Sequence, residues 1–94
     1  MGVTVPMASE DSLQRFKGLQ AQCLELFAAK NKDYGDSFRE MGLVGLMVRM
    51  QDKLARVLNI SKTQITLVEA EKLRDTLIDL ANYSLLAIML LDEE

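Results

Sequence analysis

Acidic and amide side chains recur along one stretch near the carboxyl end of the chain, where residues 71–83 read E-K-L-R-D-T-L-I-D-L-A-N-Y. The recurring residues are Glu71, Asp75, Asp79 and Asn82. They stand at i, i+4, i+8 and i+11, so on an α-helix they share one stripe roughly 80° wide. Like charges at this spacing destabilise an isolated helix. We therefore expect cationic groups to face the stripe.

A second charged stripe lies upstream, on a segment whose apolar spacing is also helical. Its members recur at i, i+3, i+4 and i+7 and are Arg49, Asp52, Lys53 and Arg56. The segment K-N-K-D-Y-G before it adds Lys30, Lys32, Asp33 and Tyr34. Acidic and basic stripes that face each other are compatible with a network of salt bridges, and equally with a site for magnesium and phosphate.

The chemistry of magnesium fits this set of residues. Magnesium prefers six oxygen ligands, keeps several waters and is usually held by a few carboxylates together with substrate phosphates. The candidate metal ligands are Asp52, Glu71, Asp75 and Asp79. The candidate phosphate-binding cations are Arg49, Lys53 and Arg56, with Lys30 or Lys32. No glycine-rich phosphate loop occurs, so we expect side chains and metal to bind the phosphates. Because no histidine, serine or cysteine nucleophile stands in a suitable context, we expect metal-activated water to attack phosphorus with a carboxylate as base.

Three helices are predicted to position these groups. The first is capped by Ser9 or Asp11 and runs to about Lys30, where K-N-K-D-Y-G is expected to break it. The second runs from Gly42 to Leu58, with apolar residues at Leu43, Leu46, Met47, Met50, Leu54 and Val57. Residues 59–66 form a polar connector in which Thr66 is a candidate N-cap, and the third helix runs from Leu67 to Leu91.

The fold class expected from this pattern is an all-α antiparallel helical bundle. Residues 1–94 form one domain, with a flexible N-terminus at residues 1–8, and no stretch alternates as a strand does. Three helices leave the long last helix incompletely covered. We therefore expect a homodimer or homotetramer that completes four-helix packing across a two-fold axis.

Bulk properties exclude several classes of function. A net charge of −3 gives no general attraction for a nucleic acid polymer or an anionic membrane, and the longest apolar run, Leu85–Leu91, is too short to span a bilayer. The absence of histidine excludes histidine-based triads. The single cysteine, Cys23, cannot form an internal disulfide and is interpreted as a core thiol in a reducing compartment, so a cytoplasmic location is expected.

Three motifs together resemble the all-α nucleoside triphosphate pyrophosphohydrolases of the MazG-like superfamily, and most closely a small nucleotide-modification-associated branch. They are K-N-K-D-Y-G at Lys30–Gly35, R-x-x-D-K-x-x-R at Arg49–Arg56 and E-x-x-x-D-x-x-x-D-L-A-N-Y at Glu71–Tyr83. The resemblance covers about Leu24–Leu91. It implies an oligomeric helical bundle that uses Mg²⁺ to split a (deoxy)nucleoside triphosphate into monophosphate and pyrophosphate.

The resemblance assigns roles to particular residues. Asp75 matches the aspartate of the family's E-x-x-D motif, and Asn82 matches an asparagine that contacts the nucleoside. Glu71 stands one place before the motif's glutamate. Where the family has E-E-x-x-E, only Asp52 is acidic here, so fewer metal ions are expected, with Lys53 and Arg56 supplying cationic charge. Tyr34 and Tyr83 are candidates for stacking on a base.

Two classes of function follow from these observations. The first is a Mg²⁺-dependent nucleoside triphosphate pyrophosphohydrolase with Asp52, Glu71 and Asp75 as catalytic carboxylates, acting in nucleotide pool cleansing or modified-nucleotide metabolism. The second is a nucleotide-binding or helical interaction module that keeps the fold and has lost turnover.

Overall fold

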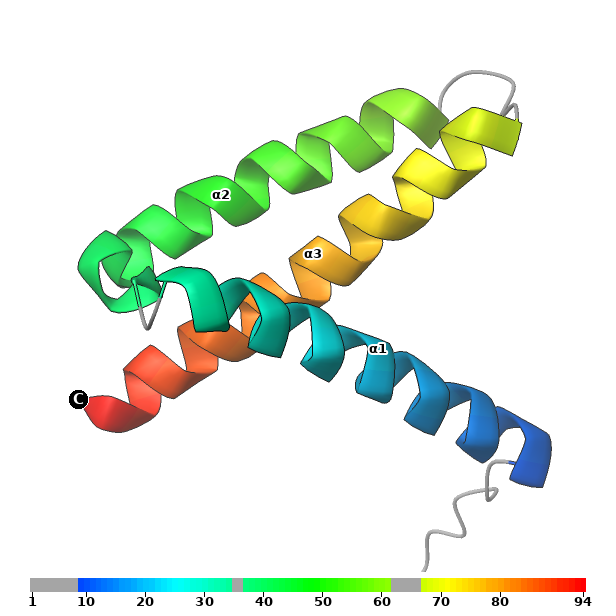
Figure 1. The fold of residues 1–94 in the computed structure, drawn as a ribbon. Coiled ribbons are helices and arrows are strands. Elements are labelled where there is room, and N and C mark those ends of the chain that lie inside the picture. Colours follow the sequence, from blue (N-terminus) through cyan, green and yellow to red (C-terminus); the bar gives the residue numbers. More distant parts are fainter. Residues whose placement is uncertain (1–8, 35–36, 62–66) are drawn as a thin grey trace, which may run out of the picture.

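The protein consists of three α-helices, shown in Figure 1. The structure is a computed structural model that describes residues 9–34, 37–61 and 67–94, without the side chains of residues 32–34, 61 and 67. The helices are α1 (Glu10–Tyr34), α2 (Phe38–Ser61) and α3 (Leu67–Glu93). No strand occurs in the described ranges, which confirms the all-α prediction. Residues 1–8, Gly35 and Thr66, on which predictions were made, lie outside those ranges.

A serine begins α1, and the helix extends further than its sequence suggests. The Ser9 hydroxyl oxygen accepts a hydrogen bond from the backbone N–H of Ser12 at 3.1 Å, so Ser9 rather than Asp11 is the N-cap. The helix continues to Tyr34, and the break predicted to start at Lys30 is therefore wrong. Polar residues such as Asn31 cost a helix only a fraction of a kcal/mol each, roughly 0.7 or less, so turn preference does not end α1 there.

One glycine divides α2 into a first turn and a main helix. Gly42 has φ 74° and ψ 170°, a conformation that is essentially restricted to glycine. Residues 38–41 therefore form a separate turn, and the predicted start of the main helix at Gly42 is confirmed. The helix ends at Ser61 rather than Leu58, and α3 continues past Leu91 to Glu93.

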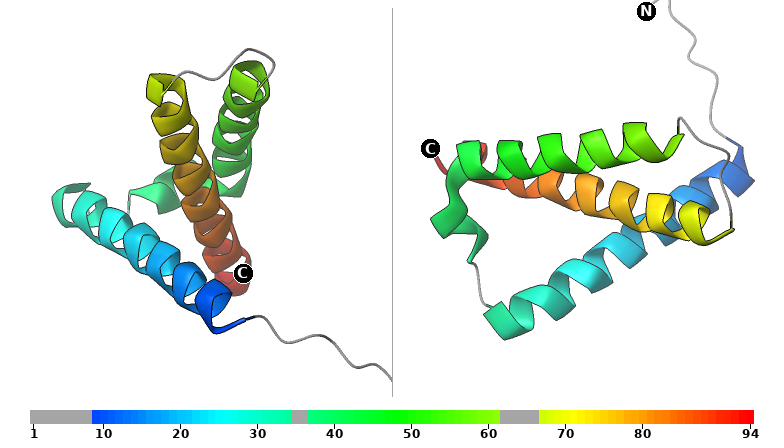
Figure 2. Two further views of the ribbon diagram at one scale, coloured as in Figure 1. Left: turned by 90° about the vertical axis from the view of Figure 1, so that its right-hand side faces the viewer. Right: turned by 90° about the horizontal axis from the view of Figure 1, so that it is seen from above.

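Helices α2 and α3 form an antiparallel hairpin, and α1 lies across it. Figures 1 and 2 show α2 running back along α3, while α1 crosses the carboxyl-terminal half of α3 and its own amino-terminal half leaves the other two helices. Over the described residues, none of the three helices contains a stretch apolar enough to cross a membrane.

The core is small and lies where the three helices meet. Among the described residues, the buried hydrophobic side chains are Phe38, Leu46 and Ala87, surrounded by the half-buried Phe27, Leu43, Tyr83, Leu86 and Leu90. Met47 and Leu54, assigned to the same apolar face as Leu46, are 56% and 48% exposed instead. Their exposure shows that α2 has two apolar surfaces, of which α3 covers one.

Replacement of Gly42 by alanine tests the division of α2. Because a side chain at φ 74° is strained, Gly42→Ala should lower the free energy of unfolding by about 1–3 kcal/mol in chemical denaturation. Gly18 is the matched control, since it lies inside α1 with open space around it. Gly18→Ala should instead raise stability by roughly 0.5–1 kcal/mol. Equal effects of the two substitutions at one protein concentration would contradict a special role for Gly42.

Candidate functional site

An aspartate on α3 joins lysines from both other helices. The Lys53 ammonium of α2 lies 3.2 Å from Asp79 Oδ2, and the Lys30 ammonium of α1 lies 3.5 Å from Asp79 Oδ1. The Lys53 and Asp79 side chains are half-buried, whereas 61% of the Lys30 side chain is exposed. Three of the predicted site residues are thus brought together, with two positive charges for one negative charge.

A pocket of about 180 Å³ opens beside this ion cluster. Its polar lining includes Lys30, Asn31, Ser37, Asp79 and Asn82, and its apolar lining is Phe27, Phe38, Met41, Tyr83 and Leu86. Tyr83, a predicted stacking residue, is half-buried in this wall. An apolar pocket with a few polar and charged groups in its lining is the usual form of a small-molecule site.

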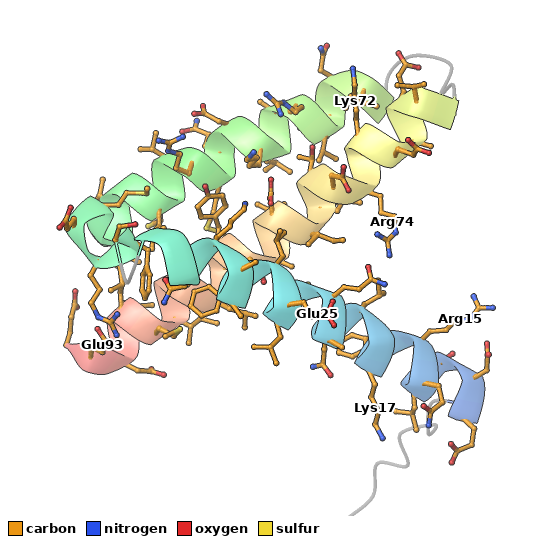
Figure 3. The ribbon with its side chains drawn as sticks, in the orientation of Figure 1. Arg15, Lys17, Glu25, Lys72, Arg74 and Glu93 are labelled. Carbon is orange, nitrogen blue, oxygen red and sulfur yellow. The ribbon has the colours of Figure 1, made fainter. Side chains whose placement is uncertain are left out.

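Ring packing and a cation–π contact hold the aromatic wall of the pocket in place. The rings of Phe27 and Phe38 pack edge to face with centroids 6.3 Å apart. The Arg39 guanidinium lies 4.8 Å from the centroid of the Phe38 ring and pairs with Glu93 at the end of α3, which Figure 3 labels. These contacts connect the first turn of α2 to both α1 and α3.

Two amide groups fasten α1 across α3. Asn82 Nδ2 donates to the backbone carbonyl of Cys23 at 3.2 Å, so Asn82 has a structural bond besides its place in the pocket lining. The second hydrogen bond joins two side chains, with Arg74 Nη2 donating to Gln22 Oε1 at 2.8 Å, and lies nearer the amino end of both helices (Figure 3 labels Arg74). The crossing of α1 over α3 is therefore fixed at more than one point.

A shallower hollow continues from Asp79 toward the amino end of α3. It is lined by Arg56, Ile60, Lys72, Asp75, Thr76 and Asp79. This hollow brings Arg56 of α2 to the same side of the hairpin as Asp75 and Asp79 of α3. The predicted opposition of basic and acidic stripes is therefore present for these residues.

The four predicted metal ligands do not converge. Within the ranges that the structure describes, no three carboxylate or thiol groups lie close enough together to hold a metal ion. Glu71 and Asp79 are two helical turns apart, which is about 12 Å along the axis, and Glu71 lines neither hollow. Asp52 and Arg49 are exposed on α2 and line neither hollow. A single chain thus does not fit the predicted magnesium centre.

Two predicted residues cannot be placed at the site, and two residues of the pocket lining were not predicted. Lys32 and Tyr34 belong to the last turn of α1, but their side chains lie outside the described residues. Phe38 and Met41 line the pocket and were not identified as site residues from the sequence. Phe38 follows directly after the turn between α1 and α2, and this position next to K-N-K-D-Y-G is the signal that would have found it.

Removing the Asp79 charge tests the ion cluster. Asp79→Asn keeps the side-chain shape and loses both ion pairs, so it should lower the free energy of unfolding by about 1 kcal/mol. The control is Arg15→Gln, which removes the pair of Arg15 with Asp11 on the exposed part of α1 and should cost less than roughly 0.5 kcal/mol. Indistinguishable denaturation curves for the two variants would contradict a structural role for the cluster.

Comparison with known proteins places the chain in a family. The family model described as nucleotide modification associated domain 1 matches residues 30–91. The matched region begins at Lys30 and contains Lys53, Asp79 and the whole of α2, so it includes the ion cluster and covers well over half of the chain. No curated protein and no solved structure is significantly similar to the chain. The chain belongs to the nucleotide modification associated domain 1 family.

Proposed function

We propose that this domain is a MazG-like nucleoside triphosphate pyrophosphohydrolase that takes the Mg²⁺ complex of a (d)NTP as its substrate. The observation that supports this proposal is the convergence of Lys30 and Lys53, from different helices, on Asp79, which together with Lys30 lines an apolar pocket with aromatic walls. A nucleotide needs both features, because its phosphates are anionic and its base is flat and largely apolar.

The proposed pose follows from the order of groups along the hairpin. The nucleoside lies in the pocket against Tyr83 and Phe38, and the phosphates extend past Lys30 and Lys53 toward Arg56. Asp79 holds the two ammonium groups in place before the substrate arrives, which reduces the entropy lost on binding. A triphosphate carries more negative charge than one carboxylate, so it competes well for the same lysines.

The proposed reaction is hydrolysis at the α-phosphorus. Water attacks the α-phosphorus, the bond to the oxygen that bridges the α- and β-phosphorus breaks, and pyrophosphate leaves with that oxygen. Asp75 is the carboxylate that best fits the role of general base, since it lines the hollow with Arg56 and Asp79. The products are a (d)NMP and pyrophosphate, as expected for pool cleansing or for modified-nucleotide metabolism.

A second candidate is a nucleotide-binding module without turnover. One observation favours it: in the described part of the chain, no cluster of carboxylates is close enough together to hold a metal ion. In this case the same lysines and pocket bind the nucleotide, and the exposed Asp52 and Glu71 have no catalytic part.

A panel of common and modified dNTPs with Mg²⁺ tests the proposal through pyrophosphate release. Lys53→Ala should lower kcat/KM about tenfold or more, because it removes a charge-assisted hydrogen bond to phosphate. Asp75→Asn should lower kcat with little change in nucleotide affinity. The control Lys17→Ala, on the part of α1 that leaves the hairpin (Figure 3), should leave both constants unchanged.

The outcomes separate the two candidates. Release of pyrophosphate that survives Lys53→Ala and Asp75→Asn contradicts the proposed site. Calorimetric binding of the nucleotide that requires Lys53, without release of any product across the panel, supports the binding module. If the protein neither binds a nucleotide nor releases a product, both candidate functions are contradicted.

A further inference from the structure

The pocket beside the ion cluster has about the size of one aromatic ring. Its volume is about 180 Å³. An enclosed apolar cavity of about 150 Å³ takes a single benzene ring, whereas sites for drug-sized molecules measure roughly 300–1,000 Å³. The pocket therefore has room for one six-membered ring with a small substituent. The fused double ring of a purine exceeds this room.

A methionine that rests on a glycine forms part of the pocket wall. Met41 lines the pocket and belongs to the turn that Gly42 separates from the main helix of α2. A Cβ atom at position 45 would lie 2.6 Å from Met41 Cγ and 3.9 Å from Met41 Sδ. The first distance is far below the roughly 3.5–4.0 Å at which carbon atoms pack. Met41 thus has its present position because residue 45 is a glycine.

The contact with Gly45 fixes one part of the Met41 side chain and leaves the other part adaptable. Cγ is held against the glycine, while the side chain as a whole is 38% exposed, so its end can still rotate. Methionine is unbranched, fits irregular surfaces and makes favourable contacts between its sulfur and aromatic rings. Such a wall can follow the shape of a small ring substituent, but it does not make room for a second ring.

The polar lining of the pocket suits the edge of a base. Asn82 Nδ2 donates to the backbone carbonyl of Cys23, which orients the amide, and Asn82 Oδ1 can accept a hydrogen bond from a base N–H. The Ser37 hydroxyl also lies in the lining and can donate or accept. A few polar groups in an apolar pocket are enough to orient a ring.

We propose that Met41, held against Gly45, sets the size of the base that this site accepts, and that its substrates are nucleotides of single-ring pyrimidine bases, with or without a small ring substituent. The inference rests on the proposed function for the phosphate end of the ligand and adds the class of base. The base contacts Met41 and the aromatic wall formed by Phe38 and Tyr83, which is a packing that any pyrimidine can make.

A comparison of pyrimidine with purine triphosphates tests the size limit. In the pyrophosphate assay, kcat/KM for dCTP, dTTP and dUTP should exceed that for dATP and dGTP about tenfold or more, because a purine overfills the pocket. Met41→Ala enlarges the pocket and should lower this ratio about tenfold. The control Met47→Ala removes an exposed methionine outside the pocket lining and should leave the ratio unchanged. Equal constants for purines and pyrimidines, or a ratio unaffected by Met41→Ala, would overturn the inference.

Gly45→Ala tests the contact without shortening Met41. The new Cβ displaces Met41 Cγ, so Gly45→Ala should lower kcat/KM for dCTP about fivefold in the unmodified chain. In the Met41→Ala background the displaced atom is absent, and the same substitution should have no further effect. Equal effects in both backgrounds would overturn the role assigned to Gly45.

Nucleosides without phosphates separate this inference from the proposed function. Deoxycytidine or thymidine should shift the Met41 methyl resonance of ¹³C-labelled protein saturably and at lower concentration than deoxyadenosine. This result supports the size limit even if no triphosphate is hydrolysed. Hydrolysis of purine and pyrimidine triphosphates alike would overturn the inference and leave the proposed function standing. If neither nucleosides nor nucleotides bind, both are overturned.

Discussion

The position of α1 on the hairpin depends on the junction where Asp79 of α3 meets lysines from α1 and α2 and where Phe27 packs on Phe38, together with the two hydrogen bonds that Asn82 and Arg74 of α3 donate to α1. The amino-terminal half of α1 is exposed, and few hydrophobic residues in the described ranges are buried. Exposed ion pairs contribute ~0–1 kcal/mol each. The lysine of α1 is mostly exposed, so its ion pair contributes little, and the aromatic contact and the two hydrogen bonds have most of the effect.

This junction is also the wall of the pocket. Fold and candidate site consequently share the same residues: Asp79 pairs with Lys30, which lines the pocket beside it, and Phe38 lies in both the core and the lining.

The positions of the helices along the chain were predicted more accurately from the sequence than the packing of the helices against one another. Apolar spacing located α2 and α3, and Ser9 was correctly considered as the cap of α1, because these features are set by nearby residues. Spacing could not show that Met47 and Leu54 face away from α3, since a wide apolar arc does not say which neighbour covers it. The carboxylates share one face of α3 as predicted. A shared face does not bring them together, because eight residues of helix extend about 12 Å.

The nucleotide is proposed to bind where Lys30, Lys53 and Asp79 meet beside the pocket. The most direct test is a titration of ¹⁵N-labelled protein with the Mg²⁺ complex of a non-hydrolysable dNTP analogue, followed through the backbone amide resonances. If the nucleotide binds there, saturable shifts should centre on residues 30, 38, 53 and 79–83, with little change at the amino end of α1. An absence of shifts, or shifts confined to other parts of the helices, would contradict it.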